Sequence, residues 1–206
     1  MDGVITETSE YHYMAWKLLA SHIGIYIDRN INEQLKGVSR MDSLEVILKH
    51  GNRENDFSET EKLALATTKN KRYVDMINQF NKENLLPGVE ELFKELKVLG
   101  IRIGIASASH SAAKLVDLLG IEEYVDFIVD PGTVPSKPAP DIFLAAAKGL
   151  GLKPSQCIGV EDAVAGVESI KKAKMYAIGI GDSEILGAAN VVYKTPGEIV
   201  LKEVLA

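Results

Sequence analysis

Hydrophobic residues in the first part of the chain recur at helical spacing. Between residues 9 and 23 the apolar and aromatic side chains mostly stand three or four positions apart, which predicts an amphipathic helix. Capping-box patterns that open at Ser39 and Ser58 predict two more helices, the second continuing to Ile77. We therefore expect residues 9–80 to form an all-helical domain.

After residue 88 the pattern changes to short apolar runs that alternate with helical stretches, which is typical of βαβ units. The predicted strands are 101–106, 127–129, 156–160, 175–180 and 190–193, and the predicted helices are 88–98, 110–119, 139–150 and 164–173. The pattern predicts an α/β fold with a Rossmann-like parallel sheet. Residues 1–8 and 81–206 would form this core, and residues 9–80 would be a cap domain inserted into it.

Composition and charge exclude several classes of protein. The 206 residues are 46% hydrophobic, which suffices for a medium core domain and a smaller second one. A formal net charge of -6 gives no general attraction for nucleic acid or an anionic membrane. No apolar run approaches the roughly 18 residues of a spanning helix, so we expect a cytoplasmic protein. The single cysteine, Cys157, lies in an apolar run and is predicted to be a buried strand residue.

Polar residues follow several predicted strands, where parallel sheets bind their ligands. Glu161 and Asp162 come directly after an apolar strand and suit Mg²⁺ better than zinc, since no cluster of histidines and cysteines accompanies them. The alternative interpretation is that these two acidic residues only begin a helix, where the helix dipole favours negative charge. Lys137, in a loop stiffened by prolines, could offset the charge of a phosphoryl group, or could be a solvated surface lysine. Ser107 could bind the same group or cap a helix.

Two features of the predicted cap and the start of the chain also indicate a ligand. Lys36 and Arg40 flank a glycine turn ahead of a predicted helix, an arrangement that can bind phosphate. His12 and Trp16 lie one helical turn apart on the same side, for which core packing is the alternative. Asp2, followed by glycine and two β-branched residues, is typical of the exit from a buried strand, although no strand precedes it.

Taken together, the Asp2-Gly3-Val4 start, Ser107, Lys137 and the Glu161-Asp162 pair resemble, in order and context, the four motifs of the haloacid dehalogenase superfamily. The resemblance covers essentially the whole chain. Within that superfamily the cap is similar to that of the β-phosphoglucomutases, above all in the string Asn32-Glu33-Gln34-Leu35-Lys36-Gly37-Val38-Ser39-Arg40. This long and unusual string makes the match specific.

The resemblance implies a mutase that interconverts β-glucose 1-phosphate and glucose 6-phosphate. Family members work through bound β-glucose 1,6-bisphosphate and a phosphoaspartyl enzyme, and they require Mg²⁺. It implies the following roles: Asp2 as general acid and base, with Thr8 and His12 governing its position and timing; Leu35, Lys36, Gly37, Val38 and Arg40 at the distal phosphate; Ser107, Ala108 and Lys137 at the transferring phosphoryl group; Trp16, Lys69 and Ser109 at the sugar; and Asp2, Glu161 and Asp162 at Mg²⁺.

The chain departs from the family pattern in two places. His110 and Ser111 stand where the family usually has a basic residue and an asparagine, and a histidine binds phosphate well only when protonated. The family pattern Asp-x-Asp-Gly-Val also puts the nucleophile one position before Met1, and Asp2 matches the second aspartate. We therefore expect the chain as written to be inactive and poorly stable, and to be rescued by an upstream strand ending in aspartate.

Two other functions stay open at this point. One is a sugar-phosphate-binding protein that forms no phosphoenzyme, and the other is a related sugar phosphatase with a cap that admits water. The string at residues 35–40 favours the mutase over the phosphatase. In each case we expect a monomer whose partner is a small sugar phosphate, with neither nucleic acid nor a membrane involved.

Overall fold

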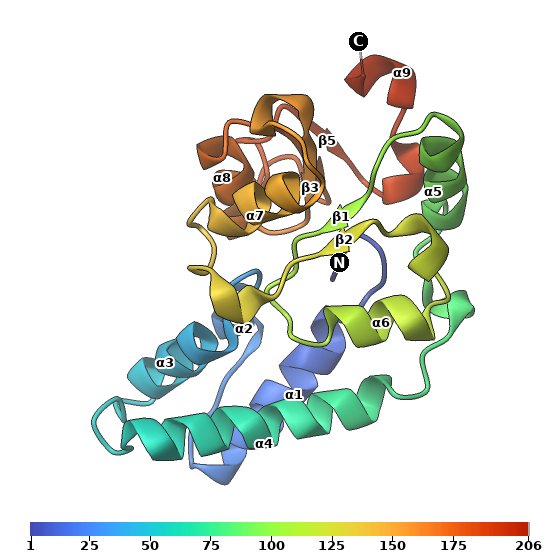
Figure 1. Cartoon of the computed structure of the whole chain (residues 1–206). Helices are drawn as coiled ribbons and strands as arrows, with labels where there is room; N and C mark the ends of the chain where they lie inside the picture. Colours follow the sequence, from blue (N-terminus) through green and yellow to red (C-terminus); the bar gives the residue numbers. More distant parts are fainter. Residues whose placement is uncertain (206) are drawn as a thin grey trace. The chain divides into compact units, whose positions relative to one another are not determined.

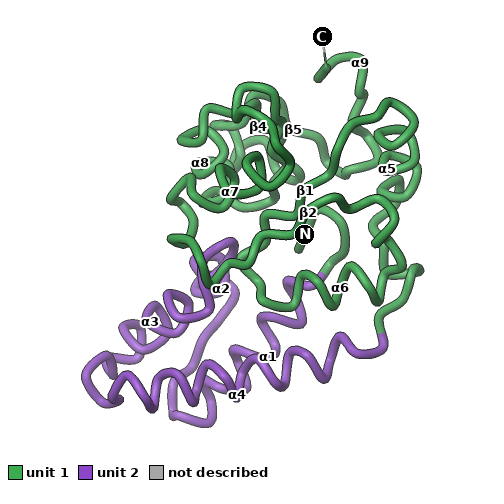
Figure 2. Tube along the Cα trace, viewed as in Figure 1, with its two compact units in different colours: residues 1–7, 80–206 green, residues 8–79 purple. Residues whose placement is uncertain are grey.

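The computed structural model describes residues 1–205, which divide into two compact units. One unit is made of residues 1–7 together with the chain from Phe80 onward, and the other of Thr8–Gln79 (Figure 2). Below they are called the core unit and the cap unit. The chain leaves the core unit once and returns to it once, as expected of an insertion.

The cap unit consists of the helices α1 (Ser9–His22), α2 (Arg29–Glu33), α3 (Arg40–His50) and α4 (Glu59–Ile77) (Figure 1). The three helices predicted from the sequence are confirmed. The Ser58 cap of α4 is a complete capping box with Glu61. The unit is not helical throughout, because Gly24 takes the left-handed conformation, at a φ of 75°, and an extended segment follows it as far as α2.

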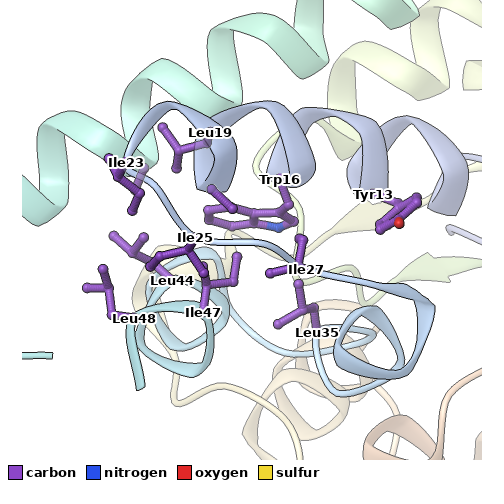
Figure 3. Packing of buried hydrophobic residues seen from close by; sticks show 12 residues of the cluster. Tyr13, Trp16, Leu19, Ile23, Ile25, Ile27, Leu35, Leu44, Ile47 and Leu48 are labelled. Carbon is purple, nitrogen blue, oxygen red and sulfur yellow. The ribbon is translucent and has the colours of Figure 1, made fainter. Parts of the chain in front are cut away.

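The cap unit has a hydrophobic core of its own (Figure 3). Figure 3 shows the Trp16 ring of α1 among side chains of the extended segment and of α3. The buried residues of this cluster are Tyr13, Trp16, Leu19, Ala20, Ile23, Ile25, Ile27, Leu35, Leu44, Ile47, Leu48 and Ala66. The extended segment that interrupts the helices therefore contributes to the core through Ile25 and Ile27.

The core unit alternates strands and helices in the predicted order (Figure 1). Its strands are β1 (Gly104–Ile105), β2 (Phe127–Ile128), β3 (Ile158–Glu161), β4 (Tyr176–Ile180) and β5 (Val191–Tyr193). Its helices are α5 (Val89–Val98), α6 (Ala112–Leu118), α7 (Asp141–Gly149), α8 (Val164–Lys172) and α9 (Leu201–Val204). The predicted α/β fold is confirmed.

All the strand pairs are parallel, as predicted, but the described residues form two sheets where one was expected. One sheet pairs β1 with β2, and the other has the order β3-β4-β5. The first residues turn back on themselves: the Ile5 amide donates to the Met1 carbonyl at 2.8 Å, and the Gly3 amide donates to the Thr6 carbonyl at 2.9 Å. Folded in this way, they extend neither sheet.

The two points where the chain leaves and re-enters the core unit are bound to each other. The Thr6 hydroxyl donates to the Asn84 carbonyl at 2.7 Å, and the Leu86 amide donates to the Ile5 carbonyl at 2.9 Å. Thr6 and Leu85 also form an antiparallel bridge. The segments on either side of the insertion thus lie side by side.

Helices α7 and α8 cover the two sheets, α7 against β1 and β2 and α8 against β3 and β4. Gly159 of β3 lets α8 come close, because a Cβ there would lie 2.6 Å from the Ile170 side chain. Cys157 corrects a prediction: it precedes β3 and is half-buried, with its thiol near the Lys153 carbonyl. Within residues 1–205 no helix is long and apolar enough to cross a membrane.

Candidate active site

The N-terminal turn of the core unit packs against Asp162. Gly3 has a left-handed φ of 65°, and a Cβ on it would lie 2.1 Å from the Asp162 Oδ2. Only glycine meets both conditions without displacing the carboxylate. The Asp-Gly pair at the start of the chain and the Glu-Asp pair at the end of β3 therefore belong to one site.

Negative charge is concentrated around Asp162. Burial raises the pKa of this carboxyl to about 7, with further upward contributions from the charges of Glu161 and Asp2, while Lys137 acts in the opposite direction. A buried carboxylate beside two others is unfavourable, since its charge is poorly solvated and is offset only in part by Lys137 and the amino group of the chain. A cation bound here would relieve that repulsion.

Lys137 and Glu161 form a buried ion pair in the same unit. Lys137 is 4% exposed and Glu161 is 7% exposed, and the lysine Nζ also stands 5.1 Å from the centre of the Phe143 ring. Lys137 donates to the Oε1 of Glu161. Buried charges are normally paired in this way, so the lysine of the proline-rich loop is not the solvated surface residue that was its alternative.

The acidic residues suit a magnesium ion better than a metal that needs many protein ligands. Among residues 1–205 no group of three or more histidine, cysteine, aspartate or glutamate side chains converges as a ligand set. Mg²⁺ is commonly held by one or two carboxylates, with water and phosphate oxygens completing its shell. The excess negative charge at Asp162 fits that requirement.

Ser107 begins a loop of nested serine turns after β1. Its hydroxyl, which is buried, accepts from the Ser109 amide at 3.1 Å, and the Ser109 hydroxyl accepts from the Ser111 amide at 3.2 Å. Ala108 lies half-buried between the first two serines. Ser107 therefore shapes the loop, and the helix that it was expected to cap begins later, at Ala112.

His110 is exposed on the same loop and faces Asp130, with 3.9 Å between Nδ1 and the carboxylate Oδ1. Asp130 is itself fixed, because the same oxygen accepts from the Gly132 amide at 2.9 Å. This partner was not identified from the sequence. The available signal was that both residues follow paired parallel strands, β1 and β2, whose carboxyl ends lie at one edge.

In the cap unit, the string at residues 35–40 forms a turn that leads into α3. Leu35 is buried in the cap core, Gly37 has a left-handed φ of 74°, and the Lys36 Nζ lies 2.9 Å from a Glu33 carboxylate oxygen. Val38 is half-buried, and the Ser39 hydroxyl caps α3 by accepting from the Asp42 amide. The basic turn is thus built on the hydrophobic core of its unit.

Arg40 is the first residue of α3, and its side chain is half-buried. Its Nε is fully enclosed and has no hydrogen-bond partner in the part of the chain that the structure describes. Burial lowers the pKa of the guanidinium. A buried donor without a partner is costly, and an anion would supply the missing acceptor.

A second basic group of the cap unit lies between α1 and α4. The Lys69 Nζ is 2.6 Å from the His12 Nδ1 and stands 4.7 Å from the centre of the Trp16 ring. The His12 ring stacks on Tyr73 at 3.8 Å. Thr8, which precedes α1, is fully buried. Trp16 is only 3% exposed and belongs to the cap core, which agrees with core packing, the alternative for this residue.

The predicted residues therefore gather in three groups, one in the core unit and two in the cap unit. In the core unit the structure brings together Asp2, Lys137, Glu161 and Asp162, with the serine loop at the end of β1. In the cap unit it brings together His12, Trp16 and Lys69, and separately the turn that ends at Arg40. Phe143, under Lys137, was not predicted as part of the site.

Comparison with known proteins agrees with this geometry. A family profile described as haloacid dehalogenase-like hydrolase matches residues 1–174. β-Phosphoglucomutase of Bacillus subtilis (strain 168) is 43% identical over 203 residues, which cover 98% of this chain and 90% of the relative. The fructose-1-phosphate phosphatase YqaB of Escherichia coli (strain K12) is 29% identical over 181 residues, which cover 87% of this chain and 93% of that relative.

A solved structure is similar along the whole chain. The crystal structure of a β-phosphoglucomutase from Clostridium difficile matches with a TM-score of 0.97 and 45% identity, covering 99% of this chain and 92% of that one. Both units are included in that match. The chain belongs to the haloacid dehalogenase-like hydrolase family, and within it to the β-phosphoglucomutases.

Proposed function

We propose that this protein is a phosphohexomutase that interconverts β-glucose 1-phosphate and glucose 6-phosphate through β-glucose 1,6-bisphosphate and an aspartyl phosphate. The observation that carries the proposal is the 43% identity to a β-phosphoglucomutase over 98% of the chain, which includes the cap unit. The sequence identity to the phosphatase YqaB is lower, at 29%. A cytoplasmic monomer that acts on a small sugar phosphate is part of the proposal, without nucleic acid or membrane as partner.

In the core unit, Asp2 would exchange a proton with the sugar hydroxyl as general acid and base. Lys137, oriented by Glu161, would hold the transferring phosphoryl group together with Ser107 and Ala108. His110 and Ser111 would contact the same group less strongly than the usual basic residue and asparagine. The acceptor in this proposal is the aspartate that the family pattern puts one position before Met1.

Magnesium would be held by Asp162 and Glu161, with Asp2 beside them. Bound Mg²⁺ would supply positive charge that balances the phosphoryl oxygens during in-line transfer. The raised pKa of Asp162, which arises from burial and neighbouring carboxylates, supports a cation at this point.

In the cap unit, Arg40 would bind the phosphate that does not react, with the turn from Leu35 to Val38 around it. The partnerless Arg40 Nε supports this role. Lys69, Trp16 and Ser109 of the serine loop would contact the sugar. Thr8 and His12, at the start of the insertion, would govern the position and timing of Asp2.

A coupled assay tests the proposal by following glucose 6-phosphate made from β-glucose 1-phosphate with Mg²⁺ and a trace of bisphosphate. Two matched proteins carry the same apolar extension before Met1, ending in aspartate in one and asparagine in the other. We expect turnover only with the aspartate. Release of inorganic phosphate without the bisphosphate would instead indicate a phosphatase, and binding without turnover in either protein would indicate a binding protein.

A further inference from the structure

The loop that carries Lys137 is shaped by its own hydrogen bonds. The Ala139 amide donates to the Ser136 carbonyl at 3.0 Å, and the Ser136 hydroxyl donates to the Lys137 carbonyl at 3.2 Å. These bonds define the turn, but they do not fix it relative to the sheet. Another contact is needed for that.

Ser169 of α8 provides such a contact. The residue is 0% exposed, and its hydroxyl donates to the Ala139 carbonyl at 2.5 Å, across 30 residues of sequence. A helical serine often bonds to the carbonyl four residues before it in its own helix. Because a buried hydroxyl needs a partner, the bond to Ala139 ties the lysine loop to α8.

The same helix also contacts the partner of Lys137. Gly166 lies three residues before Ser169, on the same face of α8. A Cβ at Gly166 would lie 2.2 Å from the Glu161 Cδ and 2.3 Å from its Oε2. The helix backbone thus lies against one carboxylate oxygen, while Lys137 is bound to the other.

We propose that Ser169 is a positioning residue. Its bond to the Ala139 carbonyl holds the loop in the place where Lys137 can bond to Glu161. Gly166, which has no side chain, lets α8 contact Glu161 directly. Lys137 and Glu161 are then both held in place by contacts with the same helix, α8. The functional part of this inference rests on the proposed function, in which Lys137 holds the transferring phosphoryl group. Small displacements of such a group weaken binding and slow transfer strongly.

The first test needs no ligand. Acetylation of each lysine by acetic anhydride is followed by mass spectrometry in the wild type, in Ser169→Ala and in the control Lys171→Met, which removes a different α8 bond, 3.1 Å to the Asn190 side chain. We expect the rate at Lys137 to rise about tenfold in Ser169→Ala alone, relative to the other lysines. A rise shared by all lysines, or none at Lys137, would overturn the positioning role.

The second test is a double-mutant cycle on the dissociation constant for inorganic phosphate, measured by calorimetry with Mg²⁺. Ser169→Ala should weaken binding about tenfold in the wild type and have no effect in Lys137→Ala, because the serine acts through the lysine. Ser169→Cys, nearly isosteric with a weak donor, should lie between. Equal effects in both backgrounds would contradict the inference. If the protein extended by the apolar strand ending in aspartate binds phosphate but shows no mutase turnover, the mutase proposal fails, whereas this binding cycle can still be interpreted.

Discussion

Two of the buried lysines, Lys137 in the core unit and Lys69 in the cap unit, have different surroundings. In the core unit Lys137 is 4% exposed and forms an ion pair with Glu161. In the cap unit Lys69 is 2% exposed, bonds to the His12 imidazole and stands over the aromatic rings of Trp16 and Tyr73. A fixed negative charge balances Lys137, whereas aromatic and imidazole rings lie around Lys69.

The difference indicates what each lysine does for the fold. An ion pair in a dry environment makes the two residues depend on each other, because removing one leaves the other charge unbalanced. A lysine over aromatic rings can be replaced by an apolar side chain that keeps the packing. Four predictions test this contrast, beginning with the largest expected effect.

Lys137→Met should be the most damaging change. It leaves the Glu161 carboxylate buried without its partner, and such a loss typically destabilises a protein by about 3–5 kcal/mol. We expect that decrease in the free energy of unfolding, measured in urea, and loss of mutase activity in the protein extended by the apolar strand ending in aspartate. Adding Glu161→Gln should restore much of the stability and none of the activity. Recovery of neither would mean that the pair is not the reason for the loss.

Arg40→Ala separates binding from stability within the cap unit. The Arg40 Nε has no hydrogen-bond partner among residues 1–205, so the free energy of unfolding should change little. In the protein extended by the strand ending in aspartate, loss of a charged hydrogen-bonded contact to phosphate should raise KM about 30- to 100-fold, on the order of 2–3 kcal/mol. Arg40→Lys should recover part of this, since a lysine keeps the charge but not the two parallel bonds. An unchanged KM would exclude Arg40 from the phosphate site.

Magnesium binding should depend on pH through Asp162. Folding raises the pKa of this carboxyl to about 7, so its contribution to stability is present below about pH 4 and is lost as the pH rises through 7. Bound Mg²⁺ offsets that loss. The affinity for Mg²⁺, measured by calorimetry, should therefore be about tenfold higher at pH 8 than at pH 6. Asp162→Asn should abolish the dependence, and its persistence would assign it to another group.

Lys69→Met should have the smallest effect on stability, about 1 kcal/mol, because the thioether keeps contact with the rings of Trp16 and Tyr73. In the protein extended by the strand ending in aspartate, KM for the sugar phosphate should nevertheless rise. Lys62→Met, on the same helix and paired with Glu45, is the matched control and should leave KM unchanged. A stability loss as large as that of Lys137→Met would remove the contrast between the two lysines.

Local signals in the sequence were sufficient for most elements of the fold. The start of α4 at the Ser58 cap and its end at Ile77 were predicted because a capping box and an apolar stripe are encoded within a few residues. The short α2 and the extended segment after Gly24 were not predicted, since five residues carry too little periodicity. The division into two sheets was not predicted either, because strand pairing depends on residues far apart in the sequence.

The site was predictable as a set of residues and not as a set of contacts. Lys137, Glu161 and Asp162 were identified because each follows a strand, where ligands bind in parallel sheets. That Lys137 bonds to Glu161, or that Gly3 packs on Asp162, depends on the fold and has no sequence signature. Ser169 was overlooked for the same reason, since nothing nearby in the sequence distinguishes it from a surface serine of a helix.

The bonded pair of segments at Thr6 and Leu85 has a consequence for how the cap could have been acquired. Because the chain leaves the core unit and returns to it at adjacent points, the whole of Thr8–Gln79 is, for the core unit, one loop whose two ends are held together. The entropy of closing a loop grows only logarithmically, by about 0.6 kcal/mol for each doubling of its length. Insertions of very different size could therefore be exchanged at this junction at little thermodynamic cost to the core unit.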